Sequence, residues 1–297
     1  MLPPYPIQAF CRRALSKREN CIIFTTLSIV KAMKKELINI IKYLATYGLL
    51  LVGPVTILAV ATVVNDHLHG GTMDSDTVWQ TPYMTTGVTL GTLLCIVVFL
   101  WKRWAVIGMG RITRSDVWMV ALMSVLLFVG WYFPEDYLIR VFDVPDNMTE
   151  QDYENLTGGM VGLIDTGFIT PVAEELLCRG AILGALLRLM PRRPWVAIVV
   201  QAVIFGVIHM NPVQMVFGSF YGVMLGWLCW RTASLLPGMA IHIFNNVSAL
   251  VMPESFSNAL SDLNATATIT AIALSLCVLA CSIVWFEKKY KAEKHDA

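Results

Sequence analysis

Residues 171–180, PVAEELLCRG, decide how this sequence folds, because they place two glutamates and an arginine inside a long apolar segment. An ionisable residue near the centre of a bilayer costs roughly 2.5–3.5 kcal/mol on insertion scales, and it usually faces a protein interior or a cavity. If the segment crosses a membrane, Glu174, Glu175 and Arg179 therefore need partners or a chemical role. The composition of the whole chain predicts that it does cross one.

The chain carries too few charges for a soluble protein. Charged residues make up 14% of its 297 residues and hydrophobic residues 56%, whereas soluble domains carry about 25% charge. Since a spanning helix needs about 20 apolar residues, the apolar runs predict about eight membrane spans. The runs cover 43–64, 83–101, 116–133, 160–190, 194–210, 213–230, 235–251 and 267–286. We therefore expect an all-α, polytopic transmembrane bundle that is a multi-pass protein of the cell membrane.

The charges of the connections predict the orientation of the spans. Lysines and arginines precede the first span and follow the second, fourth, sixth and eighth, whereas the opposite connections at 65–76, 143–155 and 253–262 are acidic or neutral. Basic connections usually face the cytoplasm, so we expect both termini to be cytoplasmic. A net charge of +1 indicates no nucleic-acid partner. Seven cysteines without a CxxC pair indicate neither a disulfide framework nor a zinc knuckle.

The two glutamates of the fourth span are predicted to lie on different sides of the helix. Positions four apart share a helical face, so Glu175 is expected to pair with Arg179. Glu174 lies five residues before the arginine and is left free to act as a general base. The plain interpretation of Glu175 and Arg179 is a structural ion pair that fastens the bundle. Asp165, near the start of the same span, is interpreted as a boundary residue.

Two further apolar segments carry polar residues at the same helical spacing. Phe205 and His209 are four apart in FGVIH, and His242 and Asn246 are four apart in HIFNN. Taken singly, each histidine is more often a packed or interfacial residue, and the asparagine an interhelical hydrogen-bonding residue. If the three helical faces converge, a carboxylate base meets imidazole and amide donors at one point. That arrangement supports attack of water on a carbonyl group.

These three motifs, in this order, resemble those of the CPBP family. EELLCR at 174–179 fits the pattern EExxxR, FGVIH at 205–209 fits FxxxH, and HIFNN at 242–246 fits HxxxN. The family comprises the type II CAAX prenyl endopeptidases and their bacterial Abi relatives, and the resemblance covers roughly 160–255. It implies a bacterial intramembrane endopeptidase built as an eight-helix bundle.

The resemblance also implies a role for each site residue. Glu174 and His209 would activate a water molecule, and His242 and Asn246 would form the oxyanion hole. The supporting side chains would be Glu175, Arg179 and Phe205. No cofactor or metal is expected, because the zinc motif HExxH is absent. The alternative is a zinc ion held by Glu174, His209 and His242.

On this basis the chain divides into four parts. A basic lead-in at 1–40, which we expect to be dispensable, precedes the first three spans at 41–159, a catalytic core at 160–255, and the last span with its basic tail at 256–297. The substrate would be a membrane-embedded or membrane-associated peptide, either lipidated or bacteriocin-like. The alternatives are a proton-coupled membrane transporter and a non-catalytic adaptor or immunity protein on the same fold.

One geometric requirement stays open at the level of sequence. At 1.5 Å per residue, Glu174 and His209 lie roughly 20 Å from the basic ends of their spans, whereas His242 lies only about 10 Å from residue 235. The three side chains can meet if residues 231–238 dip into the membrane, so that the seventh span starts deeper. Otherwise the expected boundaries of the spans are wrong.

Overall fold

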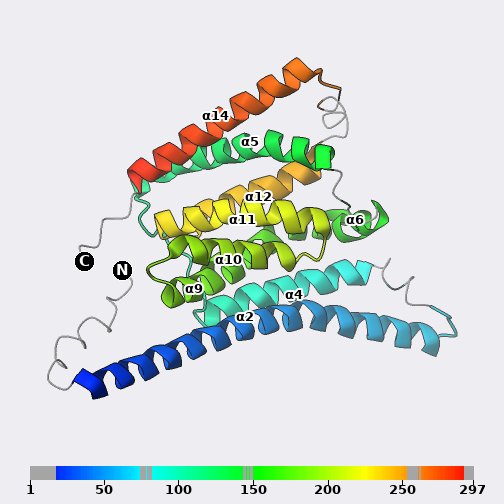
Figure 1. The fold of residues 1–297 in the computed structure, drawn as a ribbon. Helices are drawn as coiled ribbons and strands as arrows, with labels where there is room; N and C mark the ends of the chain where they lie inside the picture. The colour runs from blue at the N-terminus through cyan, green and yellow to red at the C-terminus, as the bar shows by residue number, and fades with distance from the viewer. Residues whose placement is uncertain are drawn as a thin grey trace.

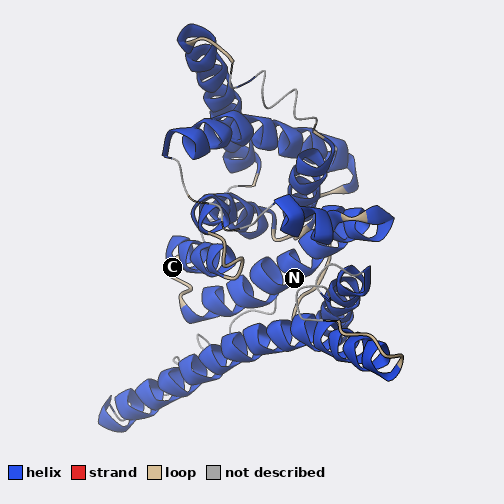
Figure 2. Cartoon of the chain, turned by 90° about the vertical axis from the view of Figure 1, so that its right-hand side faces the viewer, coloured by secondary structure: helices blue, strands red, loops and turns tan. Residues whose placement is uncertain are grey.

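The chain folds into helices, as its apolar runs predict. A computed structural model describes residues 18–73, 82–142, 150–252 and 262–290, together with positions 78, 145, 147 and 260. Within these residues there are helices and connecting loops and no strand (Figure 2). Five helices are long and apolar enough to cross a membrane, and two shorter apolar helices lie among them. The predicted all-α transmembrane bundle is thus confirmed.

Every predicted span is helical in the structure. The first three are α2 (Arg18–Leu68), α4 (Pro82–Trp101) and α5 (Val117–Phe142). The fourth is a broken run of α7 (Gly159–Ile164), η2 (Asp165–Ile169), α8 (Thr170–Glu175), η3 (Leu176–Ile182) and α9 (Leu183–Leu189). The last four are α10 (Pro194–Val207), α11 (Pro212–Thr232), α12 (Leu236–Val251) and α14 (Ala265–Lys289). The short helices η1 (Arg114–Asp116) and α6 (Glu150–Thr157) lie in connections.

The bundle has two outer helix pairs around a central group. Figure 1 shows α2 and α4 along one edge, α5 and α14 along the opposite edge, and α9, α10, α11 and α12 between them. Helix α2 begins and α14 ends on the same side of the bundle. Glycines let the outer pairs approach closely, as is common between membrane helices. A β-carbon at Gly130 of α5, for example, would lie 2.7 Å from the backbone nitrogen of Leu279 in α14.

The start of α12 is buried beneath the connection between α4 and α5. Thr232 and Ser234 are almost fully buried. The Arg111 amide donates to the Thr232 carbonyl at 2.7 Å, and the Ser234 hydroxyl donates to the Gly108 carbonyl at 2.6 Å. This burial agrees with the first alternative for the seventh span, in which residues 231–238 dip inward. It brings His242 to the depth of Glu174 although few helical residues precede it.

Two expectations from the sequence need correction. The first helix does not start near residue 43, because α2 already begins at Arg18 and includes most of the predicted lead-in, whose residues 1–17 lie outside the described part of the chain. Asp165 is not a boundary residue, because its side chain is buried inside the fourth span. The second error arises because burial of a polar residue depends on neighbouring helices that its own segment does not reveal.

Charged residues fasten the last helix to the bundle. The Glu287 carboxylate accepts hydrogen bonds from the Trp227 indole and the Arg231 guanidinium, each at 2.7 Å, so that α14 is tied to α11. The Lys289 ammonium lies 2.6 Å from the Asp116 carboxylate at the start of α5. These contacts stabilise one end of α14, while Gly130 sets its close approach to α5 further along.

Candidate active site

The helix that carries the two glutamates is interrupted by π-helical turns on either side of them. In the first, η2, the Thr170 amide donates to the Asp165 carbonyl five residues before it. Pro171 has no amide hydrogen and its ring crowds the preceding turn, which gives a physical reason for the wider π geometry. The second, η3, begins directly after Glu175 and contains Arg179. Such turns are frequent at functional sites, and Pro171 was the only sequence signal for the first of them.

Glu175 and Arg179 form the ion pair that their spacing predicts. Their Oε1 and Nη1 atoms are 2.7 Å apart, and both side chains are fully buried. The guanidinium carbon also lies 4.1 Å from the centre of the Phe205 ring, a cation–π contact from α10. The same carboxylate oxygen accepts a hydrogen bond from His242 Nδ1 at 2.9 Å. Glu175 therefore links the arginine of its own helix to a histidine of α12.

Glu174 faces a different set of neighbours. Its Oε1 lies 3.7 Å from His209 Nε2, and its Oε2 lies 3.5 Å from His242 Nε2. Both distances are longer than an ordinary hydrogen bond and match groups that a water molecule could bridge. The carboxylate therefore has an imidazole on either side, contributed by the end of α10 and by α12. Glu174 and Glu175 thus face opposite nitrogens of the His242 ring, and only Glu175 contacts Arg179.

The hydrogen bonds of the histidines indicate which nitrogen carries the proton. His209 Nδ1 lies 2.7 Å from the Phe205 carbonyl oxygen, and His242 Nδ1 contacts the Glu175 carboxylate. Both partners only accept hydrogen bonds, so both Nδ1 atoms are donors. In the neutral state, each Nε2 then presents a lone pair towards Glu174. The two carboxylates and one guanidinium leave one negative charge, which a single proton on an imidazole would neutralise.

Aromatic rings hold the two imidazoles in place. The Phe205 ring lies edge-to-face with His209, with centroids 4.9 Å apart, and with His242, at 5.6 Å. The ring of Tyr221 in α11 also packs edge-to-face with His242, with centroids 5.9 Å apart. The spacing of FGVIH predicts that Phe205 lies beside His209. The contacts of Phe205 with Arg179 and His242 join different helices, so this spacing does not predict them. Tyr221 had no sequence signal, because it stands in an apolar run without a motif.

Asn246 lies one helical turn beyond His242 and is half-buried. Its Nδ2 donates to the Thr166 carbonyl in η2 at 3.0 Å. An amide nitrogen has two hydrogens, so one donor remains after this bond. The bond ties α12 to the broken helix of the fourth span at the π turn, a contact that the HxxxN spacing alone does not reveal.

The structure thus brings six of the seven sequence-predicted site residues into one connected group. The group consists of Glu174, Glu175, Arg179, Phe205, His209 and His242. The seventh, Asn246, joins the group through η2. Among the residues that the structure describes, no group of three or more His, Cys, Asp or Glu side chains is arranged to hold a metal ion.

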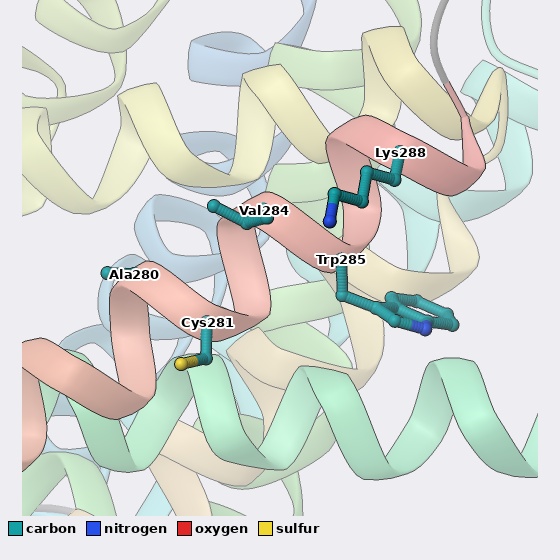
Figure 3. A pocket seen from close by; sticks show the side chains of 5 residues that line it. All are labelled: Ala280, Cys281, Val284, Trp285 and Lys288. Atoms are coloured by element: carbon teal, nitrogen blue, oxygen red, sulfur yellow. The ribbon is translucent and has the colours of Figure 1, made fainter.

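A surface hollow occurs elsewhere on the molecule. It lies on α14 and is lined by Ala280, Cys281, Val284, Trp285 and Lys288 (Figure 3). Its lining is mostly apolar and it contains no member of the Glu174 group. We assign it to the lipid-facing surface of the last helix.

Comparison with known proteins identifies the segment that carries the site. Residues 156–248 match the family model of the type II CAAX prenyl endopeptidase Rce1-like proteins. The matched segment contains Glu174, His209, His242 and Asn246 and lies close to the core expected at 160–255. No curated protein and no solved structure matches the chain. The family resemblance of the three motifs is confirmed, and residues 156–248 are similar to the Rce1-like type II CAAX prenyl endopeptidases.

Proposed function

We propose that this multi-pass membrane protein is an intramembrane endopeptidase that hydrolyses a peptide bond of a membrane-associated peptide or protein. The observation that carries this proposal is the placement of Glu174 between two imidazoles, with Nε2 atoms at 3.5 and 3.7 Å. A buried carboxylate next to two basic nitrogens can orient a water molecule and accept its proton. The family of residues 156–248 is a protease family, which supports the same reaction class.

In the proposed reaction, Glu174 and His209 act together on water. The water molecule donates one hydrogen to the Glu174 carboxylate and the other to the lone pair of His209 Nε2. As its oxygen attacks the peptide carbonyl, one proton passes to this pair and the carbonyl oxygen becomes an oxyanion. The proton is then delivered to the departing amine as the peptide C–N bond breaks. The products are a free carboxylate and a free amine.

The oxyanion is proposed to be stabilised by His242 and Asn246. His242 can donate from Nε2 when it carries the proton that balances the charge of the group, because Glu175 already accepts from its Nδ1. Asn246 contributes the amide hydrogen that Thr166 does not use. Donors placed where charge develops commonly contribute about 10²–10³-fold to a rate. Arg179 holds the Glu175 carboxylate in place through their buried ion pair.

The proposal includes the surroundings of the reaction. We propose that the side chains of this chain activate the water without a metal. We further propose that the protein resides in the cell membrane with both termini cytoplasmic. The proposed substrate is a lipidated or bacteriocin-like peptide. The depth of the site within the helical bundle supports a substrate that is itself bound to the membrane.

The test compares the parent protein with Glu174→Gln in proteoliposomes. Farnesylated and unmodified CAAX peptides and a bacteriocin-type leader peptide serve as substrates, and products are measured by mass spectrometry. We expect the parent to cleave one of these classes of peptide. Glu174→Gln should lower the cleavage rate about 10²–10⁴-fold. Dialysis of the parent against a chelator should leave its cleavage rate unchanged. Glu154→Gln, the same change on an exposed side chain of α6, is the matched control. Full activity of Glu174→Gln would refute the assignment, and Glu174-dependent ion flux without cleavage would favour a transporter.

A further inference from the structure

Side-chain exposure rises in one direction along the helices that meet at Glu174. We call the end of the bundle where α2 begins and α14 ends the terminal end, and the opposite end, next to α6, the far end (Figure 1). Helix α12 gives the clearest case, because it lies among the central helices. On the face that carries its histidine, Gly238 towards the terminal end is buried, Asn246 towards the far end is half-buried, and Ala249 is exposed. None of the residues 243–250 is buried, so protein fully encloses only the first part of α12.

The fourth span shows the same gradient. Residues 176–179 follow Glu174 towards the terminal end and are all buried, as is Ala185 further along. Towards the far end, Thr166 is half-buried, although the neighbouring Gly167 packs against α12. The glutamate therefore lies where the tightly packed part of this span ends.

Helix α10 repeats the pattern at its last turn. Gln201 and Phe205 are at most 2% exposed, whereas the His209 side chain is 19% exposed and Met210, directly after it, is 78% exposed. Three separate helices thus change from buried to exposed at the same level and in the same direction. This agreement indicates that the Glu174 group lies at the boundary between a closed half and an open half of the central bundle.

Backbone contacts close the terminal end. A β-carbon at Gly180 would overlap the β-carbon of Ala105, and one at Gly110 would overlap the carbonyl oxygen of Ala233. The connection between α4 and α5 therefore lies directly on η3 and on the start of α12. Together with the hydrogen bond from Ser234 to this connection, these contacts seal its described residues against α12.

The half-exposed side chains at the far end include several polar ones. Asn245, Asn246 and Ser248 lie on α12, and Thr166 lies on η2. Lipid does not solvate such groups, and polar residues within a membrane span usually face protein or a water-filled space. Because protein does not bury these four side chains, water is the neighbour that suits their exposed parts.

We propose that water and substrate reach the Glu174 group from the far end of the bundle, along α12 and η2. The route rests on burial and polarity and does not depend on proteolysis. The substrate that follows from it rests on the proposed function and on the proposed cytoplasmic termini. With those termini, the far end lies on the non-cytoplasmic side of the membrane. The substrate is then an exported, bacteriocin-like peptide presented on that side, and not a lipidated tail at the cytoplasmic surface.

Cysteine labelling in sealed vesicles tests the route without a substrate. Ala249→Cys and Thr166→Cys place one thiol on each of the two helices of the route, and Lys288→Cys marks the terminal end, where the lysine is exposed. Cys11 and Cys21 are changed to serine in every variant. A charged, membrane-impermeant methanethiosulfonate is added from one side at a time and reacts with thiolates that water reaches. We expect Ala249→Cys and Thr166→Cys to react only from the side opposite to the one that labels Lys288→Cys.

Two controls distinguish water from lipid and one end of the bundle from the other. Cys277 and Cys281 are exposed on α14, where a lipid-facing thiol should not react, so the chain without added cysteines sets the background. Ala185→Cys, on the terminal side of Glu174, should stay unlabelled from either side. Labelling of Ala249→Cys from the terminal side, its failure to react from both sides, or labelling of Ala185→Cys would overturn the proposal.

One-sided delivery of peptide then tests the substrate. A thiol-reactive resin captures proteoliposomes that carry Lys288→Cys on the outside and so separates the two orientations of the protein. The bacteriocin-type leader peptide and the farnesylated CAAX peptide are added outside, and we expect cleavage of the leader peptide only where the far end faces outward. Cleavage confined to vesicles with the terminal end outward would overturn the proposal. Absence of cleavage in both, with the expected labelling, would refute only the proposed function.

Discussion

Replacing each of the two adjacent glutamates by glutamine is expected to change the stability of the protein by different amounts. Glu175→Gln is expected to have the larger effect. In the structure, Glu175 Oε1 accepts from Arg179 Nη1 at 2.7 Å and from His242 Nδ1 at 2.9 Å, and the side chains of Glu175 and Arg179 have no exposed area. A glutamine keeps one acceptor oxygen but removes the only negative charge that the described residues place in direct contact with the buried guanidinium. Arg179 would then be a buried cation without a counter-ion.

The expected loss of stability follows from this burial. Removing one partner of a buried ion pair typically costs about 3–5 kcal/mol, and we expect the lower part of that range because the amide oxygen still accepts a hydrogen bond. At about 2–4 °C per kcal/mol, the unfolding temperature should fall by roughly 6–12 °C. Glu174→Gln should change stability by less than about 1 kcal/mol, because its carboxylate lies 3.5 and 3.7 Å from its imidazole neighbours and makes no short bond to them.

The assay is thermal unfolding of the purified protein in detergent, followed by tryptophan fluorescence. The parent, Glu174→Gln and Glu175→Gln are compared at the same protein and detergent concentration. A fall confined to Glu175→Gln supports the division between a structural and a reactive glutamate. Equal losses in both variants, or a change below about 1 kcal/mol in Glu175→Gln, would refute that reasoning, because the ion pair would then not be an essential contact of the fold.

Three further outcomes test other contacts. Asn246→Ala should lower kcat about 10²–10³-fold with a smaller effect on KM, measured on whichever peptide the parent cleaves. Gly130→Ala should destabilise the protein by about 1–3 kcal/mol, seen as a lower unfolding temperature, because its β-carbon would overlap the backbone of Leu279; unchanged stability would contradict the close approach of α5 and α14. Glu287→Gln should cost about 1–2 kcal/mol by weakening its bonds to Arg231, and a larger loss in high salt than in low salt would argue against this cause.

The all-helical, multi-pass character of the chain and the segment that matches the family model were predictable from the sequence. Apolar length determines whether a segment can cross a bilayer, and each predicted span coincides with helical residues. The pairing of Glu175 with Arg179 was predictable for a similar reason, because residues four apart meet on any regular helix. Glu174 was identified as the free carboxylate from the same spacing. All of these depend on distances along the chain, which the sequence contains directly.

Other features could not be read from the sequence because they depend on contacts between helices. The hydrogen bond from His242 to Glu175 joins α12 to α8, and the stacking of Arg179 on Phe205 joins η3 to α10. The buried start of α12 depends on hydrogen bonds from residues 108–111, far away in the chain. The burial of Asp165 likewise exists only once neighbouring helices are packed.

The sequence by itself thus determined which segments enter the membrane and which charged residues enter with them, because transfer into lipid depends on the composition of each segment. Only the tertiary structure decided which polar atoms face one another and which histidine nitrogen is left to face Glu174. The physical reason is that a hydrogen bond depends on distance and direction within a few tenths of an ångström. Packing of α8, α10, α11 and α12 sets those distances, and spacing along one helix constrains only the residues of that helix.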